Sequence, residues 1–304
     1  MELPTRDRSF VTEHFSSERW DNFPHRDGDI VVSTGMKVGT TWTIRIVGLL
    51  VHQDLKRVDD KVMHAPWPDA NFLGPLDALY AEMDAMEHRR FFKSHLPLDT
   101  LPYDPNVKYI NVVRHPLDMF RSLLHHWSGI SDWFQGVIKE AGHPPFPKLQ
   151  DQGTTKDVFD RWLREGRMDW ESDGWPFHSK FYVAESFWKF RHLDNVLLLH
   201  YGNMLDNLSH EIRRIEKFLG IEIDDAMHEE IVRLTTFDTM KSQNKAMNPH
   251  YDAIFTHGGD GFMRAGGRDT WKGILDAEDV AKYEMKARKF DPAFRVWLEH
   301  GLMG

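Results

Sequence analysis

The chain has 304 residues, with 38 Lys and Arg against 47 Asp and Glu, so its formal net charge is −9. Proteins that bind nucleic acid usually carry a basic field, so this acidic balance argues against that class. Apolar residues make up 41% and charged residues 28%, which is typical of a folded globular chain and too apolar for disorder. Cysteine is absent, which excludes disulfides, thiolate metal sites and a cysteine nucleophile.

The sequence also bears on targeting and on the number of domains. No apolar stretch approaches the roughly 20 residues of a membrane-spanning helix, and the first ten residues lack the apolar centre of a signal peptide. We therefore expect a cytoplasmic protein that binds neither membranes nor nucleic acid. The length is near twice that of a common domain of roughly 150 residues. Because composition does not change along the chain, we predict one domain over residues 1–304.

Short apolar runs alternate with longer helical patterns, which favours an α/β fold with a parallel sheet. In chain order we predict strands over 29–33, 90–93, 107–113 and 195–201. Helices are predicted over 41–52, from Pro116 to Trp127, and over 208–219, where apolar residues recur at helical spacing. Prolines in 128–155 and glycines in 244–270 predict two long loops, the first a lid over a site. The fold predicted is a central parallel sheet flanked by helices, like that of P-loop nucleotide kinases.

Residues 35–42 read Gly-Met-Lys-Val-Gly-Thr-Thr-Trp, between a predicted strand and a predicted helix. Open α/β sheets bind ligands at the carboxyl ends of their strands. A turn there presents backbone N–H groups and the helix adds its positive end, so a phosphate or sulfate fits. Lys37 adds a full positive charge, and Thr40 and Thr41 add hydroxyl groups. Taken alone, the motif is explained equally well by a structural glycine turn.

This loop is not a Walker A motif, because its lysine precedes Gly39 instead of following it. The strand over 107–113 also ends in Arg114, where a magnesium-binding aspartate would be needed. A cationic strand end holds an anion and not Mg²⁺. We assign no metal site, since His14 and the pair His125 and His126 show no metal-ligand spacing.

Two further segments bring charge to the same edge of the predicted sheet. Ser122 follows Arg114 by eight residues across a turn, so a guanidinium and a hydroxyl can converge on a second anion. Lys93 and His95 lie at the end of the second strand, and a histidine there can accept a proton near neutral pH. Each residue alone is more often structural or solvated. Together they indicate a ligand with two anionic groups beside a base.

These motifs resemble those of the cytosolic sulfotransferases, which move a sulfuryl group from 3′-phosphoadenosine 5′-phosphosulfate (PAPS) to a hydroxyl or amine. Residues 36–42 are similar to that family's Pro-Lys-Ser-Gly-Thr-Thr-Trp, and 93–97 to its Lys-Thr-His-Leu-Pro. Residues 114–122 are similar to its Arg-Asn-Pro-x-Asp segment with a later Ser. Tyr201, the segment 235–237, and the segments 262–266 and 269–272 match in the same order. The resemblance covers about residues 29–275.

The resemblance implies in-line sulfuryl transfer, with His95 as the general base and Lys37 and Lys93 stabilising the charge that develops. It implies a PAPS site formed by Lys37, Gly39, Thr40, Thr41, Trp42, Arg114, Ser122, Tyr201, Thr235, Phe237, Arg264 and Gly266. Within that set, the resemblance implies that the 3′-phosphate is bound by Arg114, Ser122, Arg264 and Gly266. The adenine would lie between Trp42 and Phe237. Acceptor-lining positions fall on Trp67, Phe72 and His126, which indicates a hydrophobic phenol or alcohol.

The sequence departs from the family at several positions. Met36 replaces a Pro, Val38 replaces a Ser beside the lysine, and Ala265 replaces a Lys that helps to hold the 3′-phosphate. Residues 276–277 read Asp-Ala in place of the Thr-Val of the family's dimerisation segment, so the oligomeric state stays open. Two alternatives also stay open: a P-loop nucleotide kinase or NTPase, and a nucleotide-binding module without activity. The displaced lysine counts against the first, and His95 beside Lys93 counts against the second.

Overall fold

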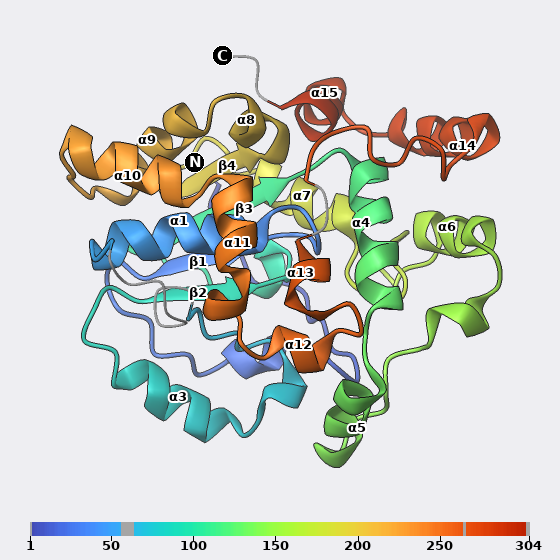
Figure 1. Cartoon of the computed structure of the whole chain (residues 1–304), viewed down its shortest axis with the longest axis horizontal. Helices are drawn as coiled ribbons and strands as arrows, with labels where there is room; N and C mark the ends of the chain where they lie inside the picture. The colour runs from blue at the N-terminus through green and yellow to red at the C-terminus, as the bar shows by residue number, and fades with distance from the viewer. Residues whose placement is uncertain (1, 56–63, 264–265, 302–304) are drawn as a thin grey trace.

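The centre of the protein is a parallel sheet. A computed structural model describes residues 2–55, 64–263 and 266–301. Four strands lie in the order β2-β1-β3-β4, and all neighbours pair in parallel. Their bounds are β1 Ile30–Ser33, β2 Phe91–Ser94, β3 Lys108–Val113 and β4 Val196–His200. Helices surround the sheet (Figure 1), so the predicted α/β fold with a helix-flanked parallel sheet is confirmed.

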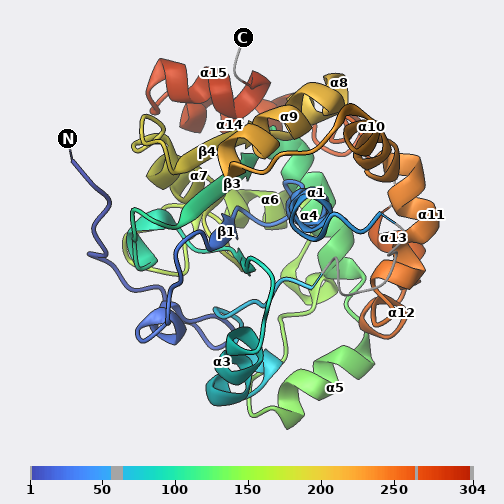
Figure 2. The ribbon, with the colours of Figure 1, turned by 90° about the vertical axis from the view of Figure 1, so that its left-hand side faces the viewer.

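Both faces of the sheet are covered by helices. Helix α1 (Thr40–His52) contacts β1 and β2, and α9 (Leu208–Leu219) contacts β4 on the same side. Helix α7 (Lys180–Trp188) packs on β3 and β4 from the other side, as Figure 2 shows. Strands covered on both faces are expected to be continuously apolar. The Ile-Val-Val run that opens β1 is accordingly buried.

The other helices form the rim of the molecule and the surroundings of the site. The α-helices are α3 (Leu76–Asp84), α4 (Pro116–Ser128), α5 (Asp132–Glu140), α6 (Thr155–Arg164), α8 (Tyr201–Asp206), α10 (Asp225–Leu234), α11 (Phe237–Met247), α12 (Tyr251–Ile254), α13 (Gly258–Phe262), α14 (Ala277–Ala287) and α15 (Pro292–His300). Single 3₁₀ turns are η1 (Ser17–Trp20), η2 (Asn71–Leu73), η3 (Leu98–Thr100) and η4 (Leu149–Gln152).

The strands and main helices lie where the sequence predicts them, within a residue or so at most ends. One difference is at the fourth strand, which ends at His200 and not at Tyr201. The His200 side chain accepts a hydrogen bond from the Gly202 backbone, which caps α8 and starts that helix at Tyr201.

The two predicted long loops are wrong in part, because both contain helices. Residues 128–155 contain α5 and η4, and residues 244–270 contain α12, α13 and the end of α11. The Ser131 hydroxyl accepts from the Phe134 backbone and so caps α5. Proline and glycine content predicts loops, whereas the Ser131 cap starts α5, and aromatic contacts such as those of Tyr251 with Phe255 and Phe262 hold α12 and α13 together.

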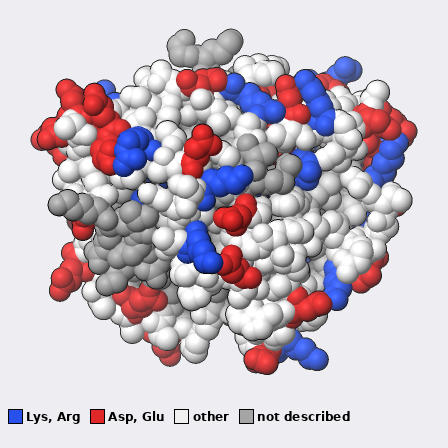
Figure 3. Space-filling view, viewed as in Figure 1, with Lys and Arg blue, Asp and Glu red and all other residues white. Residues whose placement is uncertain are grey.

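The surface carries both signs of charge. Figure 3 shows acidic and basic side chains scattered over one face, with acidic ones gathered at the upper left, where Figure 1 places α9 and α10. Among the described residues, no helix combines the length and apolarity that crossing a membrane requires.

All four strands end at one edge of the sheet, and this edge positions the site. The register aligns Ser33 with Ser94 and Val113 with His200. The residues that follow the strands are therefore neighbours in space. They include Lys37 after β1, His95 after β2 and Arg114 after β3.

Candidate active site

The turn after β1, residues 35–39, which we call the Lys37 loop, has a backbone that few sequences can adopt. Lys37 has φ 65° and Gly39 has φ 114°, both in the left-handed half of conformational space. A Cβ at Gly39 would lie 3.0 Å from Cδ2 of Tyr201. The glycine thus allows the loop to approach Tyr201 closely. The loop leads directly into α1. The first turn of α1 contains no acidic residue, so no carboxylate there would repel an anion that binds to the N–H groups of this turn.

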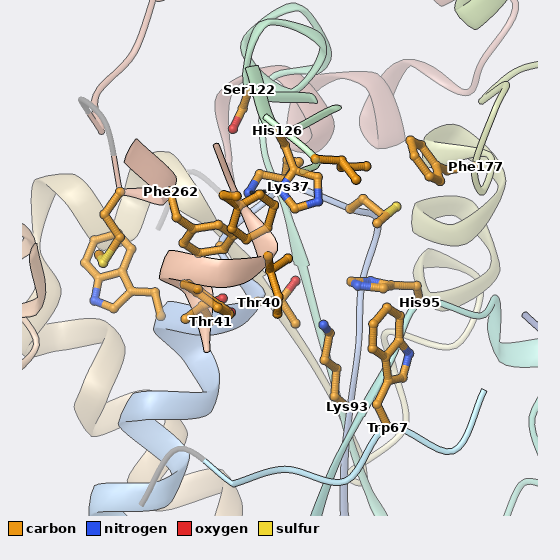
Figure 4. A pocket seen from close by; sticks show the side chains of 18 of the residues that line it. Lys37, Thr40, Thr41, Trp67, Lys93, His95, Ser122, His126, Phe177 and Phe262 are labelled. Atoms are coloured by element: carbon orange, nitrogen blue, oxygen red, sulfur yellow. Dashed lines mark hydrogen bonds between the residues drawn. The ribbon is translucent and has the colours of Figure 1, made fainter. Parts of the chain in front are cut away.

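Next to this loop is a cavity of about 390 Å³, drawn in Figure 4. Most of the predicted site residues line it: Lys37, Gly39, Thr40, Thr41, Trp42, Trp67, Phe72, Lys93, His95, Arg114, Ser122, His126, Tyr201, Phe237 and Gly266. These residues come from segments far apart in the sequence. The sheet edge and the surrounding helices therefore bring the predicted catalytic, cofactor and acceptor groups to one place.

His95 is buried in the wall of this cavity and has a defined ring orientation. Its Nδ1 lies 2.8 Å from the backbone oxygen of Thr34. A carbonyl oxygen can only accept, so Nδ1 carries the hydrogen and Nε2 is the basic nitrogen. Burial and the positive charge of Lys93 hold the pKa of His95 well below its usual range. The imidazole is therefore neutral at neutral pH and available as a base.

Lys93 points from β2 onto an aromatic ring. Its Nζ lies 3.6 Å from the centre of the Trp67 ring, a cation–π contact. Burial lowers the pKa of Lys93 to about 8, and the nearby charge of Asp69 opposes that shift. The ammonium consequently stays largely charged at neutral pH in a water-poor site, where its field acts strongly.

Lys37 is held between two side chains of the cavity wall. Its Nζ lies 3.4 Å from Nδ1 of His126 and 4.0 Å from the centre of the Phe262 ring. Burial, followed by repulsion from Lys93 and Arg114, lowers the pKa of Lys37 to about 7. Lys93 and Arg114 thus place positive charge close to Lys37 at a single cavity, and such a group of cations suits a multiply charged anion.

Arg114 and Ser122 reach the cavity from either side of the turn between β3 and α4. The guanidinium lies 4.4 Å from the centre of the Tyr201 ring, and its Nη2 donates to the backbone oxygen of Gly267 at 2.9 Å. Ser122, in the second turn of α4, lines the same cavity. An arginine fork and a hydroxyl therefore face one region, as the spacing of eight residues predicts.

The predicted adenine side of the site is formed in part. Trp42 and Phe237 line the cavity, and Nε1 of Trp42 donates to the backbone oxygen of Thr235 at 2.7 Å. Thr235 itself does not line the cavity, because its hydroxyl turns away to the Ile231 carbonyl at 2.7 Å. A Cβ at Gly266 would lie 3.0 Å from the Phe237 ring. Predicted Arg264 lies outside the described residues.

Much of the cavity wall consists of residues that were not predicted as site residues from the sequence. These lining residues are Phe15, Met36, Leu73, Ile130, Phe134, Phe146, Phe177, Met240, Tyr251, Ile254, Phe255, Phe262, Met263 and Thr270. Many are aromatic, and several lie in 128–155 and 244–270. The concentration of aromatic residues in these two predicted loops is the sequence signal that could have indicated the lining residues. Residues 128–155 contribute Ile130, Phe134 and Phe146 to the wall, which agrees with their predicted position over the site.

Among the described residues, His, Asp and Glu side chains do not form a group of three suited to a metal ion. The positive charge of the cavity comes from lysine and arginine. The fold and the cavity together define an α/β protein that binds an anionic ligand at the carboxyl edge of a parallel sheet, beside an aromatic chamber.

Comparison with known proteins identifies the family. Residues 27–290 match the family described as "Sulfotransferase domain". The chain is 30% identical to the glycolipid sulfotransferase of Mycobacterium bovis, over 94% of this chain and 92% of that protein. It is 26% identical to human sulfotransferase 1C2, over 91% and 86% of the two chains. The chain belongs to the sulfotransferase domain family and is an enzyme of this PAPS-dependent class, which confirms the predicted family.

Solved structures agree on the fold. Mouse sulfotransferase SULT7A1, solved with adenosine 3′,5′-bisphosphate (PAP), superposes with a TM-score of 0.69 at 21% identity, over 94% of each chain. A retinol dehydratase, solved with retinol and PAP, gives a TM-score of 0.70 at 21% identity, over 90% of this chain and 86% of that one. PAPS is the sulfuryl donor of the family, as predicted.

Proposed function

We propose that this chain transfers the sulfuryl group of PAPS to the hydroxyl of a small hydrophobic acceptor. The observation that carries the proposal is the convergence of Lys37, Lys93 and His95 on one cavity of about 390 Å³. A base and two ammonium groups at one cavity are what proton removal and charge stabilisation need. The wall of the cavity runs from Phe15 to Thr270, which supports one domain as the functional unit.

The donor set fits a bisphosphorylated nucleotide. The Lys37 loop and the start of α1 offer backbone N–H groups, and Thr40 and Thr41 offer hydroxyls for the 5′ side. Arg114 and Ser122 suit a 3′-phosphate. A Cβ at Gly39 or at Gly266 would lie 3.0 Å from the Tyr201 or the Phe237 ring, so glycine at these positions lets both rings keep their places in the cavity wall.

In this proposal each residue has a separate task. His95 Nε2 takes the proton from the acceptor hydroxyl, and the Thr34 carbonyl keeps the ring in the required tautomer. Lys37 and Lys93 stabilise negative charge on the 5′ side as it develops. Trp42 and Phe237 flank the adenine ring of PAPS. When bound, PAPS supplies the sulfuryl group and is left as adenosine 3′,5′-bisphosphate.

The acceptor is proposed to be a hydrophobic phenol or alcohol. Phe15, Trp67, Phe72, Phe134 and Phe146 contribute aromatic surface to the cavity. Such a wall binds an apolar body and leaves its hydroxyl to the polar end of the cavity. A relative is named for glycolipids, and another was solved with retinol, both of which have large apolar portions.

A transfer assay with labelled PAPS tests this function directly. Purified protein is incubated with a panel of phenols, alcohols and amines, and labelled sulfate esters are separated from PAPS. We expect label in at least one hydrophobic hydroxyl compound without added metal. In parallel, adenosine 3′,5′-bisphosphate should raise the melting temperature in the presence of chelator. A protein stabilised only by ATP with Mg²⁺ would contradict the proposal.

A further inference from the structure

Asp69 is a fully buried carboxylate behind the cavity wall, and the proposed function gives it no task. It precedes Ala70, which forms an isolated bridge with Phe15, and its exposed fraction is 0%. A buried charge is costly unless it is paired and hydrogen-bonded. The groups that satisfy Asp69 therefore indicate what the carboxylate holds in place.

Its partners belong to the active site. Oδ2 accepts from Nε1 of Trp67 at 2.9 Å and from the backbone N–H of His95 at 3.0 Å. Oδ1 lies 3.4 Å from Nε1 of Trp20. These three partners are N–H donors, and the Ser94 side chain also hydrogen-bonds to the carboxylate. An ionised carboxylate suits such partners because it only accepts. One side chain thus joins the Trp67 indole to the backbone of His95.

The Trp67 indole in turn contacts both groups that the proposed reaction uses on this side. Its ring is perpendicular to the His95 imidazole, with 5.1 Å between ring centres, and it lies under the Lys93 ammonium. Figure 4 shows these three side chains side by side at one end of the cavity. Rotation of the indole would therefore remove a packing surface from both His95 and Lys93.

Asp69 also supplies negative charge where the neighbouring groups are basic. Its charge raises the pKa of Lys93 against the effect of burial, whereas burial raises the pKa of Asp69 itself. The other titratable or charged groups that interact with these two residues are Arg19, Lys37, His95 and His126. Arg114 lies beyond Lys37, and His178 beyond His95. In this basic surrounding, a single carboxylate has a large effect on the charge of the nearest lysine.

We propose that Asp69 is a positioning residue for sulfuryl transfer: it fixes the Trp67 indole and the His95 backbone and supplies the counter-charge of the Lys93 ammonium. The inference rests on the proposed function, since His95 and Lys93 have defined tasks only there. Asp69 acts through Trp67, His95 and Lys93 and does not line the cavity.

The test is the pH dependence of bisphosphate binding in Asp69→Asn, which keeps the side-chain shape and removes the charge. Binding of adenosine 3′,5′-bisphosphate to the full chain is measured by calorimetry from roughly pH 6 to pH 9. Loss of a nearby opposite charge disfavours the ammonium form and so lowers the pKa of a lysine. We expect the alkaline fall in affinity to begin about one pH unit lower than in wild type. With an acceptor found in the panel, the alkaline limb of kcat should move the same way.

Asp29→Asn is the matched control. Asp29 is also buried and charge-paired, to Arg90 at 2.6 Å, but it precedes β1 at the amino end, away from the cavity. The Asp29→Asn variant should have a lower stability than wild type, and the pH dependence of its bisphosphate binding should be unchanged. An Asp69→Asn curve that overlays wild type, or an equal shift in Asp29→Asn, would overturn the inference.

A second variant covers the case in which Asp69→Asn folds poorly. Trp67→Phe removes the Nε1–H that donates to Asp69 and keeps an aromatic face for Lys93. It should shift the curve in the same direction by a smaller amount, and an unshifted curve would count against the inference. A wild-type chain that does not bind the bisphosphate would overturn the proposed function, and the inference with it. Normal wild-type binding with unshifted variants would overturn the inference alone.

Discussion

The ammonium of Lys37 lies 3.4 Å from Nδ1 of His126. Burial, followed by the charge of Lys37, holds the pKa of His126 well below its usual range, so the imidazole is neutral and Nδ1 accepts from the ammonium. The sequence predicts that His126 contacts the sulfuryl acceptor, and the structure places His126 beside the lysine of the Lys37 loop. Val38 has no hydroxyl that could contact this lysine, and His126 supplies a hydrogen-bond acceptor from α4 instead.

His126→Phe should therefore weaken bisphosphate binding. The substitution keeps an aromatic ring in the wall and removes the acceptor that favours the charged form of Lys37. A hydrogen bond of this kind contributes about 1 kcal/mol, or roughly fivefold in affinity near neutral pH. Calorimetric titration of wild type and variant measures the difference. His126→Gln, which restores an acceptor, should recover part of the loss, and equal affinity in all three proteins would contradict the role.

His95→Ala should abolish transfer and leave bisphosphate binding close to that of wild type. Loss of a general base typically costs about 10² to 10⁴ in rate. The measurement is kcat with the acceptor from the panel, beside a calorimetric Kd. His228→Gln serves as the control, because His228 is also buried but contacts Ser209, outside the cavity wall. Normal turnover in His95→Ala would mean that another group takes the proton.

Arg114→Ala should weaken bisphosphate binding more than it weakens a nucleotide without the 3′-phosphate. A hydrogen bond to a charged group contributes about 1.5 to 3 kcal/mol, roughly 10- to 150-fold in affinity. Titrations with adenosine 3′,5′-bisphosphate and with adenosine 5′-phosphate separate the two contributions. Arg164→Ala, at an exposed arginine of α6, is the control. An equal loss for both nucleotides would place the 3′-phosphate elsewhere.

The parts of the site that the sequence predicted are those fixed by local geometry. Lys37, His95 and Arg114 follow parallel strands, and the carboxyl ends of such strands meet at one edge whatever the loops do. The position of Thr235 could not be derived in this way. Its hydroxyl donates to the Ile231 carbonyl in the last turn of α10, and only its own carbonyl contacts the cavity wall, through Trp42.

The aromatic wall needed the tertiary structure. Phe15, Phe146, Phe177 and Phe262 come from four separate segments, and no periodicity in the sequence relates them. Asp69 also needed the tertiary structure. In the sequence it looks like an ordinary turn aspartate, and only the structure shows its contacts with Trp67 and with the His95 backbone.

Bisphosphate binding should weaken as pH rises and should take up protons. The pKa values of Lys37 and Lys93 are lowered to about 7 and about 8, so both ammonium groups lose protons as pH rises through this interval. A bound anion favours their charged forms and raises both pKa values, so binding above pH 7 draws protons from solution. Calorimetry at about pH 8 in two buffers of different ionisation enthalpy measures the uptake. Proton release on binding would contradict the assignment of these lysines to the anion.

Gly39→Ala should destabilise the protein and distort the Lys37 loop. A non-glycine residue at φ 114° is strained by about 1 to 3 kcal/mol, and the new Cβ would lie 3.0 Å from the Tyr201 ring. Gly74→Ala is the matched control, because Gly74 has φ 107° with nothing within 4 Å of its Cβ position. Both variants should melt at lower temperature, by about 2 to 4 °C per kcal/mol. Only Gly39→Ala should also lose affinity for the bisphosphate, since the contact with Tyr201 must shift the loop that carries Lys37. Equal affinities in the two variants would show that the close approach of Gly39 to Tyr201 is not needed for the site.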